Sequence, residues 1–362
     1  MSTTAIGVNF PTVLDVAKTR DPAGRLVPYV AQLAQANMNL TVTPFIPGNQ
    51  PNGHLSSIEV YSPLPSTVQD NQGVNPTFGK DSQSFDTFCR IEDYFEVAET
   101  VAKKFGSPNE YRMTRSLAKI RSMGRKFASL FFYGNVSTSP TDINGIAIRY
   151  NHTSTANAAT AANVISAGGA TATAQTSIYF VGNSPLGLTG IYPDMADEGA
   201  GGFYHRDHGL VTLPNAADGS GGTSGRLEIY RDSFRFVGGI GLVDWKQVIR
   251  ICNLDTVDLA TTNPQTDIKF FMQRALAYMP FETNVPPEPG VIMPKPAFWW
   301  YLNRFIRECL GHNLLDTNIA GSGIRVDNVR DPGAIYMHRY EYGGYPVGIC
   351  DVIVNTEDIV GA

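Results

Sequence analysis

Cysteine is scarce in this chain of 362 residues, and so are charged side chains. The four cysteines stand far apart in the sequence and form no CxxC pair, which excludes a zinc ribbon and a thioredoxin-type site. We therefore expect a protein that stays in a reducing compartment. Charged residues make up 17% of the chain, and the formal net charge is −5. Because no long basic run is present, a protein that grips nucleic acid through its phosphates is not expected.

Long apolar runs are also missing. No stretch approaches the ~20 apolar residues that a membrane-spanning helix needs. Residues 1–16 contain no basic segment followed by an apolar core, so they do not form a secretory signal. These absences predict a soluble protein that is made in the cytoplasm and has no membrane partner.

The most distinctive segment that the sequence does contain is a predicted helix at residues 107–133. Ser107 as N-cap, Pro108 at the first helical position and Glu110 begin it, and Gly134 ends it. We expect its apolar stripe to be buried against a sheet or another long surface. The stripe consists of Met113, Leu117, Ile120, Phe127, Leu130 and Phe131.

The segment before this helix is rich in proline and glycine. Residues 40–80 contain short alternating runs at 57–61 and 66–68, which predict a projecting two-stranded excursion that a neighbouring chain stabilises. Residues 82–102 are the predicted return strand. Residues 10–39 are predicted to form two short helices, an arm that cannot bury its apolar side chains alone.

Strands and helices intermix in the rest of the chain, which predicts the α+β class. Residues 153–176 are almost entirely small or polar and are predicted to form a surface loop with little packing. Residues 245–251 alternate, so one face of that strand is expected to point inward. The other predicted strands are 177–182, 226–230, 291–293, 340–342, 345–351 and 352–354, and the predicted helices are 266–276 and 295–311.

Two short polar clusters are the candidates for chemistry. The sequence His205-Arg206-Asp207-His208 suggests a zinc site or an acid–base pair, but its glycine-rich surroundings favour a polar surface loop. The carboxylates of Asp194, Asp197 and Glu198 suggest glycoside hydrolysis or calcium binding, and a solvated acidic loop is the favoured interpretation.

Two further motifs also have structural explanations. Gly238-Gly239-Ile240-Gly241 lacks the full GxGxxG spacing of a dinucleotide site and is predicted to turn between strands. Trp299-Trp300-Tyr301 falls on the predicted helix 295–311, where core packing is expected rather than base stacking. No P-loop, nucleophile elbow or HExxH motif occurs. The sequence thus predicts no catalytic residue, no cofactor site and no metal site, and we expect that the protein is not an enzyme.

The order of the parts is more informative than any single motif. A helical arm, a long excursion, a return strand, one long helix, a mixed region with glycine-rich loops and closing strands follow one another. This order resembles the major capsid proteins of tailed bacteriophages, the Hong Kong 97-type fold, and most closely their shorter, podovirus-like subgroup. The segments that carry the resemblance are residues 44–54, 130–135, 179–193, 244–255 and 345–357.

The resemblance implies a shell protein whose copies assemble into hexamers and pentamers. These would form an icosahedral shell around double-stranded phage DNA, located in the virion and assembled in the host cytoplasm. The implied parts are an N-terminal arm (1–39), an extended loop (40–81), a peripheral domain (82–145) with the spine helix 107–133, a mostly axial domain (146–290), and a closing helix and strands (291–362) that return to the peripheral domain.

The resemblance also implies partners. A separate scaffolding protein is expected because the sequence starts directly with the arm. A portal protein at one vertex and, where present, a decoration protein would join the shell, and DNA would be enclosed without sequence-specific binding. Some relatives crosslink a loop lysine to an asparagine, but no motif gives Lys80 that role.

Other functions remain open from the sequence alone. An encapsulin-type cellular compartment would share the fold and would carry a pocket for a cargo peptide. A carbohydrate-active enzyme would use Asp194, Asp197, Glu198 and His205. A tail or decoration component would lack the long spine helix.

Overall fold

The computed structural model describes residues 37–61, 63–70, 72–104, 107–185, 187–193, 202–216, 225–261, 264–279, 297–314, 325–327, 339–343 and 345–361. These residues form two compact units. The first unit contains 90–127, 202–216 and 225–237, and the second unit contains the others. The helices predicted between residues 10 and 36 and the strand predicted at 291–293 lie outside the described residues.

The first unit is a sheet with helices packed on it. Its sheet consists of parts of β3 (Lys80–Ala98) and β8 (Gly225–Leu242) together with β7 (Phe203–Ala216). β8 pairs antiparallel with β7 and lies between β7 and β3. The helices are α3 (Glu99–Lys104) and α4 (Pro108–Tyr133). The helix predicted at 107–133 is therefore confirmed, whereas the last residues of the predicted return strand 82–102 belong to α3.

The buried side of α4 in the first unit differs from the predicted stripe. Tyr111 and Met123 lie in the core with Phe95, Val97 and Phe234 of the sheet. The face with the early stripe residues points to solvent instead, because the sheet packs on the face that carries Tyr111 and Met123. The exposed fractions are 71% for Met113, 55% for Leu117 and 38% for Ile120. The prediction was wrong for this half of the stripe, and it is confirmed for Phe127, Leu130 and Phe131, which are buried.

The second unit is built around the central strand β5 (Gln175–Asn183), which is buried along its whole length. Antiparallel strands flank it on both sides: β9 (Val248–Asp255) and β10 (Ala297–Leu302). β13 (Tyr345–Ile349) continues the sheet parallel to β10. In sheet order the strands are β11 (Arg325–Asp327), β12 (Arg339–Tyr342), β13, β10, β5, β6 (Leu188–Tyr192), β8, β3 and β2 (Gly53–Tyr61).

The other described elements are shorter. They are α2 (Met38–Val42), β1 (Phe45–Pro47), β2 (Gly53–Tyr61), α5 (Ile146–Arg149), the 3-10 helix η2 (Ala159–Asn163), β4 (Val164–Ser166), β6 (Leu188–Tyr192), the 3-10 helix η5 (Trp245–Gln247), α6 (Thr256–Leu259), α7 (Ile268–Ala277), α8 (Arg304–Leu314), β11 (Arg325–Asp327) and β12 (Arg339–Tyr342). None of the described helices is both long and apolar enough to cross a membrane.

Aromatic and branched side chains fill the core of the second unit. Phe180 of β5 stacks on Trp300 of β10, with ring centroids 4.1 Å apart. Met272 of α7 and Ile306 of α8 are fully buried in the same cluster. Core packing was correctly predicted for Trp300 and Tyr301, which are fully buried.

The helix predicted at 295–311 is only half correct. Ala297–Leu302 is the strand β10, and α8 begins at Arg304. Asn303 separates the two, since its side-chain oxygen accepts the N–H of Ile306, 2.8 Å away, and so caps the helix. The run of aromatic residues before Asn303 favours a strand, and it fills the position between β5 and β13.

Three other predictions needed correction. The predicted surface loop 153–176 contains η2 and β4, because Val164 and Ile165 bury themselves where β4 pairs with β9. The strand predicted at 245–251 starts at Val248 and is buried on both faces. Ile249 and Ile251 pack in the core cluster with Met272 of α7, and Arg250, on the opposite face, donates to the carbonyls of Ala147 and Tyr150. The strand predicted at 352–354 is not formed, because Asp351 and Val352 lie in a turn that the N–H of Ile353 closes on the carbonyl of Cys350.

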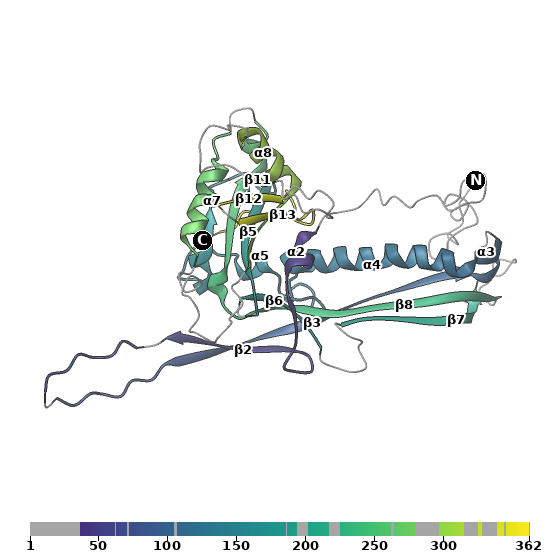
Figure 1. The fold of residues 1–362 in the computed structure, drawn as a ribbon, viewed down its shortest axis with the longest axis horizontal. Helices are drawn as coiled ribbons and strands as arrows, with labels where there is room; N and C mark the ends of the chain where they lie inside the picture. The colour runs from purple at the N-terminus through teal and green to yellow at the C-terminus, as the bar shows by residue number, and fades with distance from the viewer. Residues whose placement is uncertain are drawn as a thin grey trace. The chain divides into compact units, whose positions relative to one another are not determined.

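The excursion is two-stranded at its base, as predicted. β2 pairs antiparallel with β3 from Gly53 opposite Thr87 to Tyr61 opposite Lys80. Beyond the strand ends the chain continues as an extended loop (Figure 1). The short strand predicted at 66–68 is not formed, and the described residues between 63 and 79 belong to no helix or strand.

Candidate assembly surfaces

The tip of the excursion presents apolar side chains to solvent. Leu64 is 89% exposed and Phe78 is 84% exposed, and Val68 and Val74 are also exposed. Most single exposed apolar residues need no explanation, but four along one projecting loop are unusual for a surface that stays in water. The loop is therefore a candidate contact surface.

A buried ion pair fixes the base of the excursion. Asp86 of β3 is 4% exposed, and Nη2 of Arg149 lies 2.6 Å from its Oδ1. Oδ2 of Asp86 accepts the backbone N–H of Leu242 at 3.0 Å, and Nε of Arg149 donates to the carbonyl of Asn144 at 2.9 Å. Because each buried charge has a partner, the ion pair holds β3 against β8 and α5 at this point.

Glycines let the strands at this base approach closely. A Cβ atom on Gly53 would lie 2.2 Å from the carbonyl oxygen of Asp86, and one on Gly239 would lie 2.5 Å from that of Thr87. The turn predicted at 238–241 was wrong, since these residues lie inside β8. The glycines are there because β3 and β6 both come close to β8, which leaves no room for side chains.

The motif at 205–208 forms part of an ionic cluster in the first unit. The guanidinium of Arg112, on α4, donates from Nε and Nη2 to the two carboxylate oxygens of Asp232 at 2.9 and 2.8 Å. Arg112 also donates to Asp207, and Nε2 of His205 lies 3.3 Å from Oδ1 of Asp232. The His205 ring stacks on Phe234, with centroids 4.7 Å apart.

The predicted surface loop at 205–208 was wrong, because these residues lie in β7, paired with β8. His205 and Asp207 alternate along the strand and so share the face that meets Arg112. Burial alone would raise the pKa of Asp207, but the hydrogen bond from Arg112 lowers it below its ordinary value. The cluster joins helix to sheet. In the described part of the chain, no group of three His, Cys, Asp or Glu side chains is placed to hold a metal ion.

The other acidic candidates, Asp194, Asp197 and Glu198, lie outside the described residues, so the structure does not test the acidic loop. Lys80, at the start of β3, is exposed.

A second buried ion pair ties the C-terminal segment to the core of the second unit. Nη2 of Arg250 lies 2.7 Å from Oε2 of Glu357, and the two side chains are 4% and 5% exposed. Arg250 also donates from Nη1 to the carbonyls of Ala147 and Tyr150, and the hydroxyl of Tyr133 donates to Oε1 of Glu357. Burial raises the pKa of Tyr133 well above its ordinary value, so this hydroxyl keeps its proton.

Sequence reasoning missed Asp86, Arg149, Arg250 and Glu357. The one local signal is a single charge in an otherwise apolar strand, as at Arg250 within residues 248–254. A charge buried in that way needs a partner, but the sequence does not say which.

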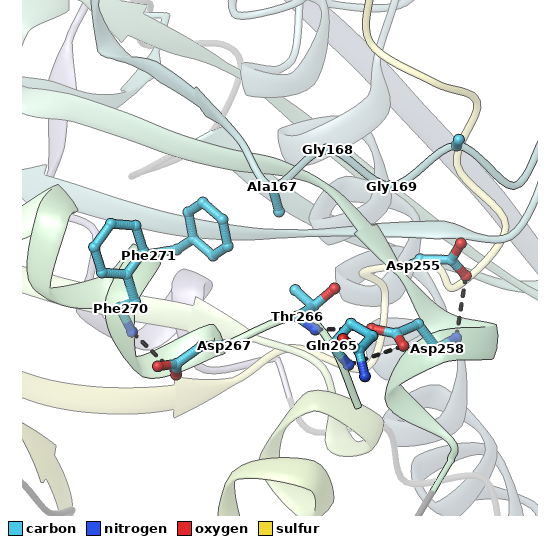
Figure 2. Close-up of a pocket in the computed structure, with 11 residues that line it drawn as sticks. Ala167, Gly168, Gly169, Asp255, Asp258, Gln265, Thr266, Asp267, Phe270 and Phe271 are labelled. Atoms are coloured by element: carbon cyan, nitrogen blue, oxygen red, sulfur yellow. Dashed lines mark hydrogen bonds between the residues drawn. The ribbon is translucent and has the colours of Figure 1, made fainter. Parts of the chain in front are cut away.

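A pocket of about 460 Å³ lies beside α6 and α7 in the second unit (Figure 2). Its three carboxylates already accept hydrogen bonds from backbone N–H groups of the segments around the pocket. Asp255 and Asp267 cap α6 and α7, and Asp258 accepts the backbone N–H groups of Gln265 at 3.0 Å and Thr266 at 2.9 Å. The pocket is thus explained by the way in which the chain enters α7.

The carboxylate of Asp258 makes stability depend on pH. The hydrogen bond from the backbone of Gln265 is the main cause that lowers its pKa below 3.8. A lowered pKa in the folded state means that the stabilisation is present above about pH 4 and is lost as pH falls through the folded-state pKa. We expect Asp258→Asn to lower the urea midpoint at pH 6 and to converge with wild type near pH 2. Equal differences at both pH values would contradict this role.

Known protein families were compared with the chain to find the family to which it belongs. The family model described as major capsid protein GP7 matches residues 21–361. The chain belongs to this family. It is a structural protein of a phage virion, and its copies form the shell of the capsid. A sequence search among curated proteins finds no match.

Solved structures agree with the family. The capsid structure of bacteriophage Epsilon15 is similar with a TM-score of 0.68 and 24% identity, over 99% of this chain and 100% of that one. This similarity confirms the Hong Kong 97-type α+β fold of the capsid protein. The bacteriophage JBD30 capsid (TM-score 0.45, 8% identity, 89% and 92% covered) and the SrpI encapsulin of Synechococcus elongatus (TM-score 0.42, 10% identity, 65% and 96% covered) are more distant.

Proposed function

We propose that copies of the capsid protein close into hexamers and pentamers, with residues 40–81 of each copy lying over a neighbouring subunit. The proposal rests on the loop at 63–79, which exposes the apolar side chains of Leu64 and Phe78. The Asp86–Arg149 ion pair holds the base of this loop in place. A two-stranded hairpin is marginal in water by itself. A neighbour that covers these side chains supplies the burial that the loop lacks.

Each predicted segment of the chain has a proposed role in the shell. The arm (1–39) and the loop (40–81) contact neighbours, the peripheral domain (82–145) carries the spine helix, the axial domain (146–290) meets its copies at the centre of each ring, and residues 291–362 close the fold. Closed rings follow from the rotational symmetry of such contacts.

The shell is proposed to assemble in the host cytoplasm with a scaffolding protein, to include a portal protein at one vertex and, where present, a decoration protein, and to enclose double-stranded DNA. The net charge of −5 supports the last point, because it provides little attraction for phosphate. No catalytic role, cofactor or metal is proposed.

Removal of the loop tip tests the proposal. A variant in which a short Gly/Ser linker replaces residues 63–79 keeps β2 and β3 paired. We expect it to fold with the circular dichroism and melting temperature of the wild-type subunit, but to form no closed shells under electron microscopy. The double variant Leu64→Ser/Phe78→Ser should reduce the yield of shells in the same direction.

Val257→Ser is the matched control. Val257 is 58% exposed in the second unit but lies outside the loop. Its variant should assemble like wild type. Normal shells from the linker variant would show that the loop does not join neighbours.

A further inference from the structure

The exposed half of the apolar stripe on α4 has the spacing of a helix–helix seam. Met113, Leu117, Ile120, Gly124, Phe127 and Phe131 follow one another at alternating intervals of four and three residues. This is the repeat of a seam that packs against a second helix. Phe127 and Phe131 are buried, but Met113, Leu117 and Ile120 remain 71%, 55% and 38% exposed. Gly124 adds no side chain, so a partner backbone can approach there.

Positive charge borders the exposed seam. Arg121 follows Ile120 directly at the flanking position of the repeat, and Arg125 lies one turn further along the helix. Within the described chain neither has an ion-pair partner, whereas Arg112, Lys103 and Lys119 are all paired with carboxylates. The edge of the seam therefore offers charge to a partner, and the seam itself offers apolar surface.

We propose that residues 113–125 of α4 dock an amphipathic helix of a partner protein, apolar along its seam and acidic along the flank that meets Arg121 and Arg125. This surface is distinct from the loop contact proposed above. Nucleic acid has phosphates for the arginines but no apolar surface for Leu117. A charged helix that brings both matches the face.

Two occupants from this chain fit the charge less well. Residues 10–36 contain three basic side chains, Lys18, Arg20 and Arg25, against two acidic ones, Asp15 and Asp21, which is a net charge of +1. A second copy of α4 would bring the same arginines to the same seam. Like charges at flanking positions oppose pairing, which is how such seams select their partners.

Two synthetic peptides probe the surface. Each has 21 residues with leucine at the seam positions, and the flanking positions carry glutamate in one and lysine in the other. Fluorescence anisotropy measures their binding to the full-length protein. We expect the glutamate peptide to bind at least roughly tenfold more tightly than the lysine peptide. Leu117→Glu should weaken binding of the glutamate peptide by roughly tenfold or more, because a buried leucine is lost.

Leu210→Glu is the control in the same unit, since Leu210 is 47% exposed on β7 and should not affect binding. The double variant Arg121→Glu/Arg125→Glu should reverse the preference between the two peptides. All three variants change exposed or half-buried positions and should keep the wild-type melting temperature.

Several results would overturn the proposal. These are no binding of either peptide, equal binding of both, or an unchanged preference in the double variant. Displacement of the glutamate peptide by a peptide of residues 10–36 would assign the seam to the arm. Loss of self-assembly in Leu117→Glu without any peptide would assign it to a second copy.

Discussion

Glu357→Ala is expected to lower the free energy of unfolding of the unassembled subunit by about 3–5 kcal/mol. The substitution leaves the guanidinium of Arg250, which is 3% exposed, without its carboxylate partner. It also removes the acceptor of the Tyr133 hydroxyl and of the Ser177 hydroxyl. Urea unfolding followed by circular dichroism measures the change.

Two variants accompany this measurement. Glu357→Gln keeps hydrogen-bonding atoms but no charge, so its loss should be smaller than that of the alanine variant. Lys103→Ala removes an ion pair on the surface of α3 and should leave the midpoint unchanged. An alanine variant at Glu357 as stable as wild type would show that the pair does not hold the C-terminal segment.

Gly134→Ala should destabilise the subunit by about 3 kcal/mol or more, because the added methyl group would clash with backbone carbonyl oxygens. A Cβ atom at this position would lie 2.2 Å from the carbonyl oxygen of Ile143 and 2.7 Å from that of Leu130. Gly145 is pinned to the same place, since its N–H donates to the carbonyl of Gly134 at 2.8 Å. The end of α4 and the segment before α5 would have to move apart.

Gly73→Ala is the matched control for this clash. Gly73 lies in the exposed loop, and a Cβ atom there would have no neighbour within 4 Å. Thermal unfolding of both variants should show a large decrease in melting temperature for Gly134→Ala and little change for Gly73→Ala. Equal melting temperatures would mean that the backbone around Gly134 can relax.

The sequence predicted helix ends correctly where these depend on residues that are close together in the chain. The cap at Ser107, Pro108 at the first position and Gly134 at the end predicted the bounds of α4 to within one residue. The sequence does not show why position 134 must be glycine, which is that the carbonyl oxygen of Ile143 leaves no room for a side chain.

Other features depend on partners far away in the chain. The same apolar spacing on α4 is exposed at Leu117 and buried at Phe131, and only the placement of the sheet decides which. The run Phe298–Leu302 fits a helix or a strand by pattern, and its neighbours β5 and β13 made it a strand.

The candidate assembly surfaces were predicted only in part. Proline and glycine marked the excursion, because they interrupt regular structure wherever they occur. The sequence did not predict the ion pair at the base of the excursion, because Asp86 and Arg149 are 63 positions apart. Nor did it predict the pair that ties down the C-terminal segment, because Arg250 and Glu357 are 107 positions apart. The match of residues 21–361 to a capsid family then identified the protein that carries these surfaces as a capsid protein.

Electron microscopy of the purified wild-type protein, expressed with and without a candidate scaffolding partner, shows whether its copies assemble into a shell. We expect closed shells or ring-shaped capsomers in at least one of the two preparations. A monodisperse monomer or small dimer under both conditions would contradict a shell-forming protein.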